Sequence, residues 1–139
     1  MRSVTKGAQM ISTALNPASV LASPFYSQGI EIRDAGRLVF VAGQVGMTAD
    51  GTVLQGIQAQ AVQAIANLSA VLGEAGLSPA DVIKVTVYLT DPTDLDPFAA
   101  AFVGADFKPR PLPPAFTVLI VYGLGSPELL VEVEAVAAR

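Results

Sequence analysis

The chain has 139 residues, of which 52% are hydrophobic and 14% are charged, and it contains neither cysteine nor histidine. This composition excludes thiolate chemistry, imidazole acid–base catalysis and the common zinc and haem sites, so no metal or cofactor is expected. A net charge of −4 argues against nucleic-acid binding, which depends on clustered Lys and Arg. No apolar run approaches the ~20 residues of a membrane-spanning helix, and we expect one cytoplasmic domain without a membrane contact.

The N-terminal part of the chain is predicted to be an arm followed by two strands. Residues 1–22 are interrupted by polar side chains and by Pro17, so they lack the compact apolar stretch of a secretory signal. We expect them to form a partly ordered arm before a domain of residues 23–139. The stretch IEIRDAGRLVFVAGQV then predicts strands at about residues 26–32 and 37–44, paired as a hairpin.

The middle of the chain carries a helical pattern and then a strand pattern. Apolar residues three and four apart predict a helix that ends near Gly76 in a left-handed cap. Its inward positions are Ile57, Ala61, Ile65, Leu68 and Leu72. Ser78 and Asp81 flank a proline in the order of a capped single helical turn. The stretch VIKVTVYL follows with the period of two that a strand requires. Its more buried side is expected to carry Ile83, Val85, Val87 and Leu89.

The last part of the chain predicts a helix, a stiff connector and two closing strands. The helix is expected over residues 96–107. Its inward residues are Phe98, Ala101, Phe102 and Ala105. Four prolines keep KPRPLPPAF extended. The element order predicts an α+β fold in which two helices cover one face of a mixed sheet. Because AFTVLIVYGL is apolar on both alternating sides, the other face needs a partner, most simply another copy of the chain.

Two glutamates in the closing strand are candidates for chemistry. In ELLVEVEAVA, the alternation of a strand puts Glu132 and Glu134 on one face with Leu130 and Val136. One interpretation makes them solvated residues at the rim of the sheet. The other places one carboxylate in a pocket at a subunit junction, where it moves protons.

Two further features admit a structural and a functional interpretation. Tyr26, in SPFYSQGI, is either an amphipathic residue at the edge of the core or a phenol that closes over a ligand. Gly43 and Gly46 flank Gln44 in VAGQVG, which indicates a sharp turn or a close approach of the backbone. This stretch is no phosphate loop, because it lacks the lysine and the spacing.

Five segments in order give the chain a resemblance to a known family. They are YSQGI, VFVAGQVG, AVQAIANLSAVLGEAGLSPADVIKVTVYLTD, PPAFTV and VEVEAVA, and together they resemble the RidA (YjgF-like) family over about residues 23–137. The resemblance implies a homotrimer of chorismate-mutase-like subunits with clefts between neighbours. It also implies cofactor-independent hydrolysis of small enamine and imine metabolites to a keto acid and ammonia.

The resemblance also implies which site residues are kept and which are changed. Family members hold the substrate carboxylate with an arginine, whose planar guanidinium presents paired donors, and the matching position here is Phe116. Three further matching positions are changed to apolar residues, namely Ala42, Ala99 and Val118. The matches that remain are Tyr26, Gly43, Thr117 and Glu132, the last at the position of the glutamate that orients the attacking water.

These matches lead to two functional hypotheses from different classes. The first is a deaminase for a neutral or aromatic imine or enamine, with Glu132 positioning water and Phe116 selecting an apolar group. Arg110 or Lys108 would be a substitute cation. The second is a trimer that has lost turnover and binds an apolar metabolite or acts as a holdase. RNA cleavage, a third class, is disfavoured by the acidic pI of about 4.5.

Overall fold

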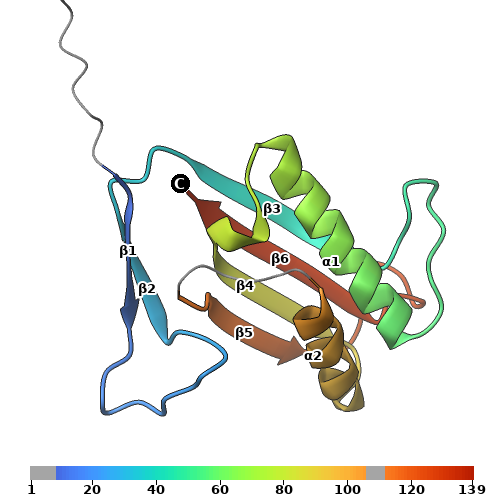
Figure 1. The fold of residues 1–139 in the computed structure, drawn as a ribbon. Helices are drawn as coiled ribbons and strands as arrows, with labels where there is room; N and C mark the ends of the chain where they lie inside the picture. The colour runs from blue at the N-terminus through green and yellow to red at the C-terminus, as the bar shows by residue number, and fades with distance from the viewer. Residues whose placement is uncertain (1–8, 106–111) are drawn as a thin grey trace, which may run out of the picture.

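The computed structural model describes residues 9–105 and 112–139, which form one mixed sheet, one small sheet and two helices (Figure 1). The main sheet has the strand order β3-β6-β4-β5. Its strands are β3 (Leu38–Val45), β4 (Val82–Leu89), β5 (Ala115–Ile120) and β6 (Val131–Ala138). Strand β6 is antiparallel to both of its neighbours, whereas β4 and β5 are parallel. The small sheet pairs β1 (Ile11–Leu15) with β2 (Gly29–Arg33).

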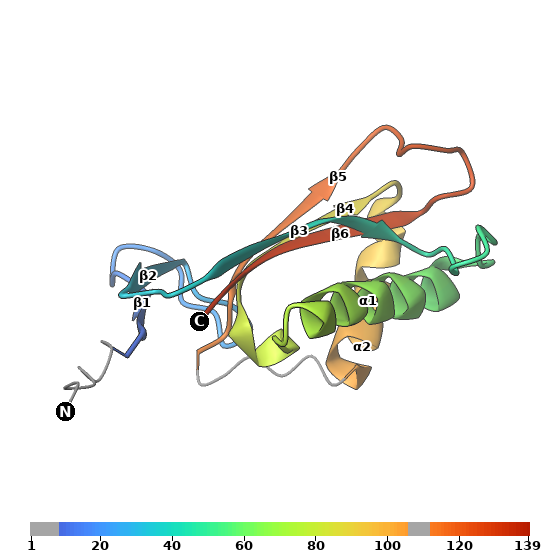
Figure 2. The ribbon, with the colours of Figure 1, turned by 90° about the horizontal axis from the view of Figure 1, so that it is seen from above.

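Both helices lie on the same side of the main sheet (Figure 2). They are α1 (Ile57–Glu74) and α2 (Leu95–Gly104), and each buries residues from the predicted inward positions. Leu68 and Leu72 of α1 are fully buried and Phe98 of α2 is 2% exposed. They pack against Val85, Val87 and Val133 of the sheet. The prediction of an α+β fold with two helices on one face of a mixed sheet is confirmed.

The predicted hairpin between the first two predicted strands is wrong. Strand β2 pairs with β1, which lies inside the predicted arm, and β3 pairs with β6 at the other end of the chain. The backbones of Arg37 and Arg139 are paired by two hydrogen bonds. The Arg37 N–H donates to the Arg139 carbonyl at 2.8 Å, and the Arg139 N–H donates to the Arg37 carbonyl at 3.1 Å. Local alternation identifies a strand without identifying its partner, so sequence proximity suggested the wrong pairing.

The predicted turns and caps in the middle of the chain are confirmed. Gly76 has a φ of +70°, a conformation that glycine adopts without a steric penalty. The Ser78 N–H donates to the Asp81 carboxylate at 2.9 Å at the start of a 3-10 turn, Pro79–Asp81. Strand β4 departs from the prediction at one end: a register irregularity between Val82 and Lys84 buries Val82 and leaves Ile83 half-buried. The predicted end of the second helix, at Phe107, lies outside the described residues.

The face of the main sheet that is opposite the helices, here called the open face, carries polar and apolar side chains together. In β6 the buried Val131, Val133 and Ala135 alternate with the half-buried Glu132 and Glu134, as predicted. At the edges of the sheet, large apolar side chains are exposed. These are Leu38 (55%), Phe40 (74%), Leu119 (41%) and Ile120 (48%). Among the described residues, no helix is both long enough and apolar enough to cross a bilayer.

Gly46 is expected to be indispensable for stability. A Cβ atom there would lie 2.4 Å from the Cβ of Gln60 and 2.5 Å from its Cα, and a helix backbone cannot withdraw cheaply. We expect Gly46→Ala to lower the free energy of unfolding by about 1–3 kcal/mol, measured by urea denaturation. Gly73→Ala is the matched control, because a Cβ atom at Gly73 would have no neighbour within 4 Å and alanine favours the helix. Equal stability of the two variants would contradict the packing argument.

Candidate functional site

Glu132 lies directly over the backbone of Gly43. A Cβ atom at Gly43 would stand 1.8 Å from Glu132 Oε1, so any larger residue would displace the carboxylate. The register of β3 against β6 is irregular between Val41 and Gln44, and Val45 pairs with Glu132. The predicted close approach at Gly43 is therefore an approach to a side chain of the neighbouring strand. The structure brings these two predicted site residues together.

The two glutamates of β6 have different environments. Tyr88 Oη donates to Glu134 Oε1 at 2.6 Å, and this hydrogen bond raises the pKa of Tyr88 because the carboxylate disfavours a phenolate beside it. The Glu132 carboxylate makes no hydrogen bond or ion pair within residues 9–105 and 112–139. Of the two carboxylates, Glu132 is therefore the one free to accept a proton or a hydrogen bond from a ligand.

A shallow hollow lies on the open face beside Glu134, and Glu132 is not among the residues that line it. It has a volume of about 490 Å³, and its lining includes Ala42, Phe40 and Glu134. Lys84 also lines it, and its Nζ donates to Thr117 Oγ1 at 2.6 Å. The register of β4 against β5 places Thr117 opposite Thr86 on this face. The hollow therefore combines an apolar rim with one ammonium and one carboxylate.

Phe116 lies on the other face of β5. Its ring packs edge to face against Phe102 of α2, with ring centroids 5.4 Å apart and planes at 79°. Val118, two residues further along the strand, also packs against the helix-side core. Ala99 is exposed one turn before Phe102 on α2. Phe116 is half-buried, so part of its ring remains accessible at the edge of the sheet.

Tyr26 is placed at the outer edge of β5 by its neighbour Ser27. Ser27 is 1% exposed, forms a bridge to Ala115, and donates from its hydroxyl to the Pro113 carbonyl at 2.6 Å. Its N–H donates to the Pro114 carbonyl at 3.1 Å. The prolines of the connector thus fix the segment that carries Tyr26. The first predicted strand starts at Gly29, so Tyr26 precedes it and is not part of it as predicted.

With one exception, the predicted site residues therefore fall into two groups. The open-face group consists of Ala42, Gly43, Thr117 and Glu132. The β5-edge group consists of Tyr26, Phe116 and Val118, and Ala99 is exposed on α2, outside both groups. Within one chain, Phe116 and Glu132 project from opposite faces of the sheet, and β4 lies between their strands. The substitute cations Lys108 and Arg110 lie outside the described residues.

Several structurally important polar residues were missed from the sequence. Gln60 and Asn67 of α1 donate to backbone carbonyls at the ends of β3 and β6. The signal that was present is an amide on a helix face that is otherwise apolar, where a polar side chain needs a hydrogen-bond partner. The sequence pattern identifies Lys84 only as a polar position of its strand. Its contact with Thr117 depends on the pairing of β4 with β5, which no local pattern specifies.

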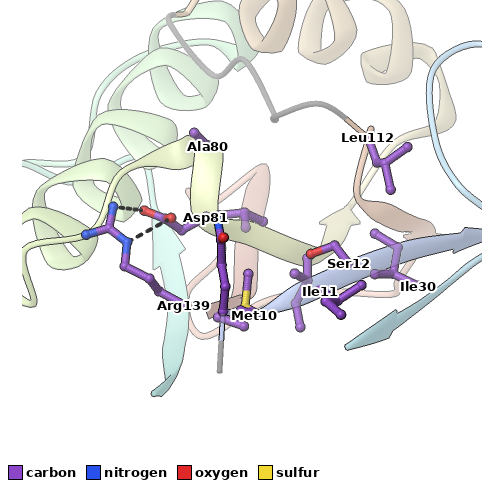
Figure 3. A pocket seen from close by; sticks show the side chains of 12 residues that line it. Met10, Ile11, Ser12, Ile30, Ala80, Asp81, Leu112 and Arg139 are labelled. Carbon is purple, nitrogen blue, oxygen red and sulfur yellow. Dashed lines mark hydrogen bonds and ion pairs between the residues drawn. The ribbon is translucent and has the colours of Figure 1, made fainter. Parts of the chain in front are cut away.

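A second cavity, of about 620 Å³, lies between β1, the Pro79–Asp81 turn and the C-terminus (Figure 3). Arg139 Nη2 forms an ion pair with Asp81 Oδ2 at 3.0 Å beside it. The lining residues include no predicted site residue. Within the part of the chain that the structure describes, no three acidic side chains are grouped to share a metal ion.

Some known proteins match nearly the whole chain, and others match about half of it. The family model described as Endoribonuclease L-PSP matches residues 17–139. The 2-iminobutanoate/2-iminopropanoate deaminase of Salmonella typhimurium is 31% identical over 93% of this chain and 96% of its own. Matches to RutC family proteins of Aquifex aeolicus and Pyrococcus abyssi, 37% and 45% identical, span 48% and 50% of this chain but only about half of those proteins, 51% and 54%.

Solved structures agree with the sequence matches. The Rid family protein YyfB of Yersinia pestis superposes with a TM-score of 0.80 at 34% identity, covering 92% of this chain and 98% of that one. TdcF of E. coli, crystallised with bound serine, gives a TM-score of 0.69 at 30% identity, covering 85% and 91%. The fold, the order of its elements and these matches lead to one conclusion: the chain belongs to the RidA/YjgF (RutC, endoribonuclease L-PSP) family.

Proposed function

We propose that this protein is a cofactor-independent deaminase that hydrolyses a small imine or enamine in clefts between subunits of a homotrimer. The observation that carries the proposal is the carboxylate of Glu132, held over Gly43 and free of partners among the described residues. The resemblance to a 2-iminobutanoate/2-iminopropanoate deaminase supports the reaction class. The serine bound to TdcF, a relative, supports a ligand of small size.

The division of the site residues supports a cleft between copies. Phe116 is at the β5 edge of the sheet and Glu132 is next to the β3 edge, on opposite faces. One chain cannot bring them around one small ligand, whereas the β5 edge of one copy can meet the open face of the next. Such an interface is heterologous and closes into a ring when the rotation permits. Exposed Phe40 and Leu38 provide apolar surface for it.

In this proposal Glu132 serves as the acid–base group. A water molecule adds to the carbon of the C=N bond as Glu132 accepts its proton, and Glu132 returns this proton to the imine nitrogen to give a carbinolamine. Glu132 then accepts the carbinolamine hydroxyl proton as the C=O bond forms and the C–N bond breaks, and it passes this proton to the departing nitrogen, which leaves as ammonia. The Gly43 backbone and Thr117 supply hydrogen bonds, and Tyr26 closes the cleft. General acid–base catalysis by a positioned side chain contributes about 10²–10⁴-fold to such a rate.

The substrate we propose is neutral or aromatic at the position where the resemblance implies that family members bind a carboxylate. Phe116 offers no donor, and its ring already packs edge to face against Phe102. A carboxylate facing this ring would lose a charge-assisted bond of about 1.5–3 kcal/mol and incur a desolvation cost. Ala42, Ala99 and Val118 enlarge the apolar character of the same cleft. An aromatic or aliphatic imine matches these surfaces better.

Assembly is tested by mass in solution. We expect light scattering to give about three times the subunit mass of 14.3 kDa. Phe40→Glu should weaken the trimer, because it places a charge on the open face where the side chain is 74% exposed in the single chain. Val71→Glu is the control: Val71 is 41% exposed on α1, away from the residues assigned to the cleft, and its replacement should leave the mass unchanged. A wild-type monomer would contradict the proposed cleft.

Catalysis is tested at the two glutamates. We expect Glu132→Gln to reduce ammonia release by about 10²–10⁴-fold, because the amide cannot accept a proton from water. Glu134→Gln is the matched control: its carbonyl oxygen can still accept the Tyr88 hydroxyl, so we expect an effect below about threefold. The assay uses 2-imino acids and carboxylate-free aromatic imines generated in situ. Saturable binding of these compounds without ammonia from any of them would favour the non-catalytic binding protein.

Substrate selection is tested at Phe116. We expect Phe116→Arg to raise kcat/KM for 2-iminopropanoate by about 10–100-fold, which corresponds to one regained charge-assisted hydrogen bond. The same substitution should lower kcat/KM for an aromatic imine. Phe116→Leu keeps the position apolar and should not improve the imino acid. An unchanged preference in Phe116→Arg would show that this position does not face the substrate.

A further inference from the structure

Gln60 is a buried amide whose hydrogen-bonding capacity is directed at two loops. Its side chain is on α1, and the residue is 1% exposed. Nε2 donates to the carbonyl of Glu128 at 2.8 Å and to that of Leu54 at 2.9 Å, and Oε1 accepts from the N–H of Leu130 at 2.8 Å. Both amide protons and the acceptor oxygen are therefore used on backbone groups that lie outside regular strands.

Two of these bonds fix the start of β6. The Leu130 N–H is held by Gln60, and its carbonyl accepts from the Thr90 N–H at 3.2 Å. Leu130 is thus fixed from both sides immediately before the strand begins at Val131. Glu132 is two residues later, and in a strand this spacing puts it on the same face as Leu130. The position of Leu130 therefore helps to fix the backbone from which the Glu132 side chain projects.

The third bond fixes the strand on the other side of Glu132. The Leu54 carbonyl accepts from Gln60, and the Leu54 N–H donates to the carbonyl of Gly46 at 2.9 Å. Gly46 directly follows Val45, the residue that pairs with Glu132. Gly46 must lack a Cβ because α1 approaches it at Gln60. Asn67, two turns further along α1, adds a bond from Nδ2 to the Val45 carbonyl at 3.1 Å.

We infer that Gln60 is a positioning residue for Glu132: it holds the ends of β3 and β6 at the spacing that keeps this carboxylate over Gly43. The inference rests on the proposed function, since it assigns Gln60 a part in placing the residue on which that function depends. An apolar residue at position 60 would leave two carbonyls and one N–H without partners, and the loops would have to open to find water. A misplacement of about 1 Å at a catalytic group is enough to cost 10²-fold in rate.

The experiment compares Gln60→Met with Gln58→Met in the whole 139-residue chain. Methionine has a similar length and makes none of the three bonds. Gln58 is exposed on the same helix, so its replacement controls for the change in helix composition. In Gln60→Met we expect the Leu130 amide to exchange with deuterium at least about tenfold faster, by NMR. The Gly43 amide resonance should shift because the Glu132 carboxylate moves away from it. Gln58→Met should match the wild type in both.

Kinetics separate positioning from a general loss of stability. With an imine that the wild type hydrolyses, we expect Gln60→Met to lower kcat by about 10–100-fold while KM stays within about twofold, at a temperature where the variant is folded. Gln60→Glu retains the shape if methionine prevents folding. Its protonated form can donate to one carbonyl, so its activity relative to wild type should be higher at pH 6 than at pH 9.

The outcomes distinguish this inference from the proposed function. Unchanged Leu130 exchange and an unchanged Gly43 resonance in Gln60→Met would overturn the positioning role. So would a lower unfolding temperature with wild-type kcat, because Gln60 would then be merely structural. If the wild type releases no ammonia from any imine, the proposed function fails. The Leu130 and Gly43 measurements still decide in that case whether Gln60 holds Glu132 in place.

Discussion

The double pairing of β6 is the constraint on which the rest of the structure depends. This strand hydrogen-bonds to β3 on one side and β4 on the other, so it cannot slip by one residue without exchanging its two faces. Val131 and Val133 are consequently fixed toward the helices, and Glu132 and Glu134 toward the open face. The same pairing brings Val45 opposite Glu132 and makes room for the carboxylate above Gly43.

The site residues follow from this arrangement together with the parallel pairing of β4 and β5. Phe116 and Glu132 lie in the same sheet but project from its opposite faces. A function that needs both residues around one ligand therefore requires a second copy of the chain. Tyr88 donates its hydroxyl to Glu134, whereas the Glu132 carboxylate has no hydrogen-bond partner in the part of the chain that the structure describes. The family includes a 2-iminobutanoate/2-iminopropanoate deaminase among its members, and the edge-to-face pair of Phe116 and Phe102 is the observation on which the proposed preference for a neutral or aromatic substrate rests.

The sequence predicted correctly those features that depend on a single segment of the chain. The helix cap at Gly76, the Ser78–Asp81 turn and the facing of Glu132 all follow from conformational preference or from the alternation of one segment. Strand partners could not be predicted, because the pattern suggests that β2 pairs with β3, whereas β2 pairs with the preceding strand β1 and β3 pairs with the distant β6. The anchoring by Gln60 was missed for the same reason: its three partners lie up to 70 residues away in the chain.

The central place of β6 also bears on how the chain reaches its native state. This strand follows β3, β4 and β5 in the sequence, yet β3 has no other partner in the main sheet as the described residues form it. Within the main sheet, β4 and β5 are the only neighbouring strands among the described residues that can pair before β6 is synthesised, and parallel pairs form slowly. Strand β3, with its apolar side chains, therefore has no partner strand in the main sheet until β6 has been synthesised. Completion of the main sheet therefore depends on β6, and a fragment that lacks this strand would be prone to aggregate.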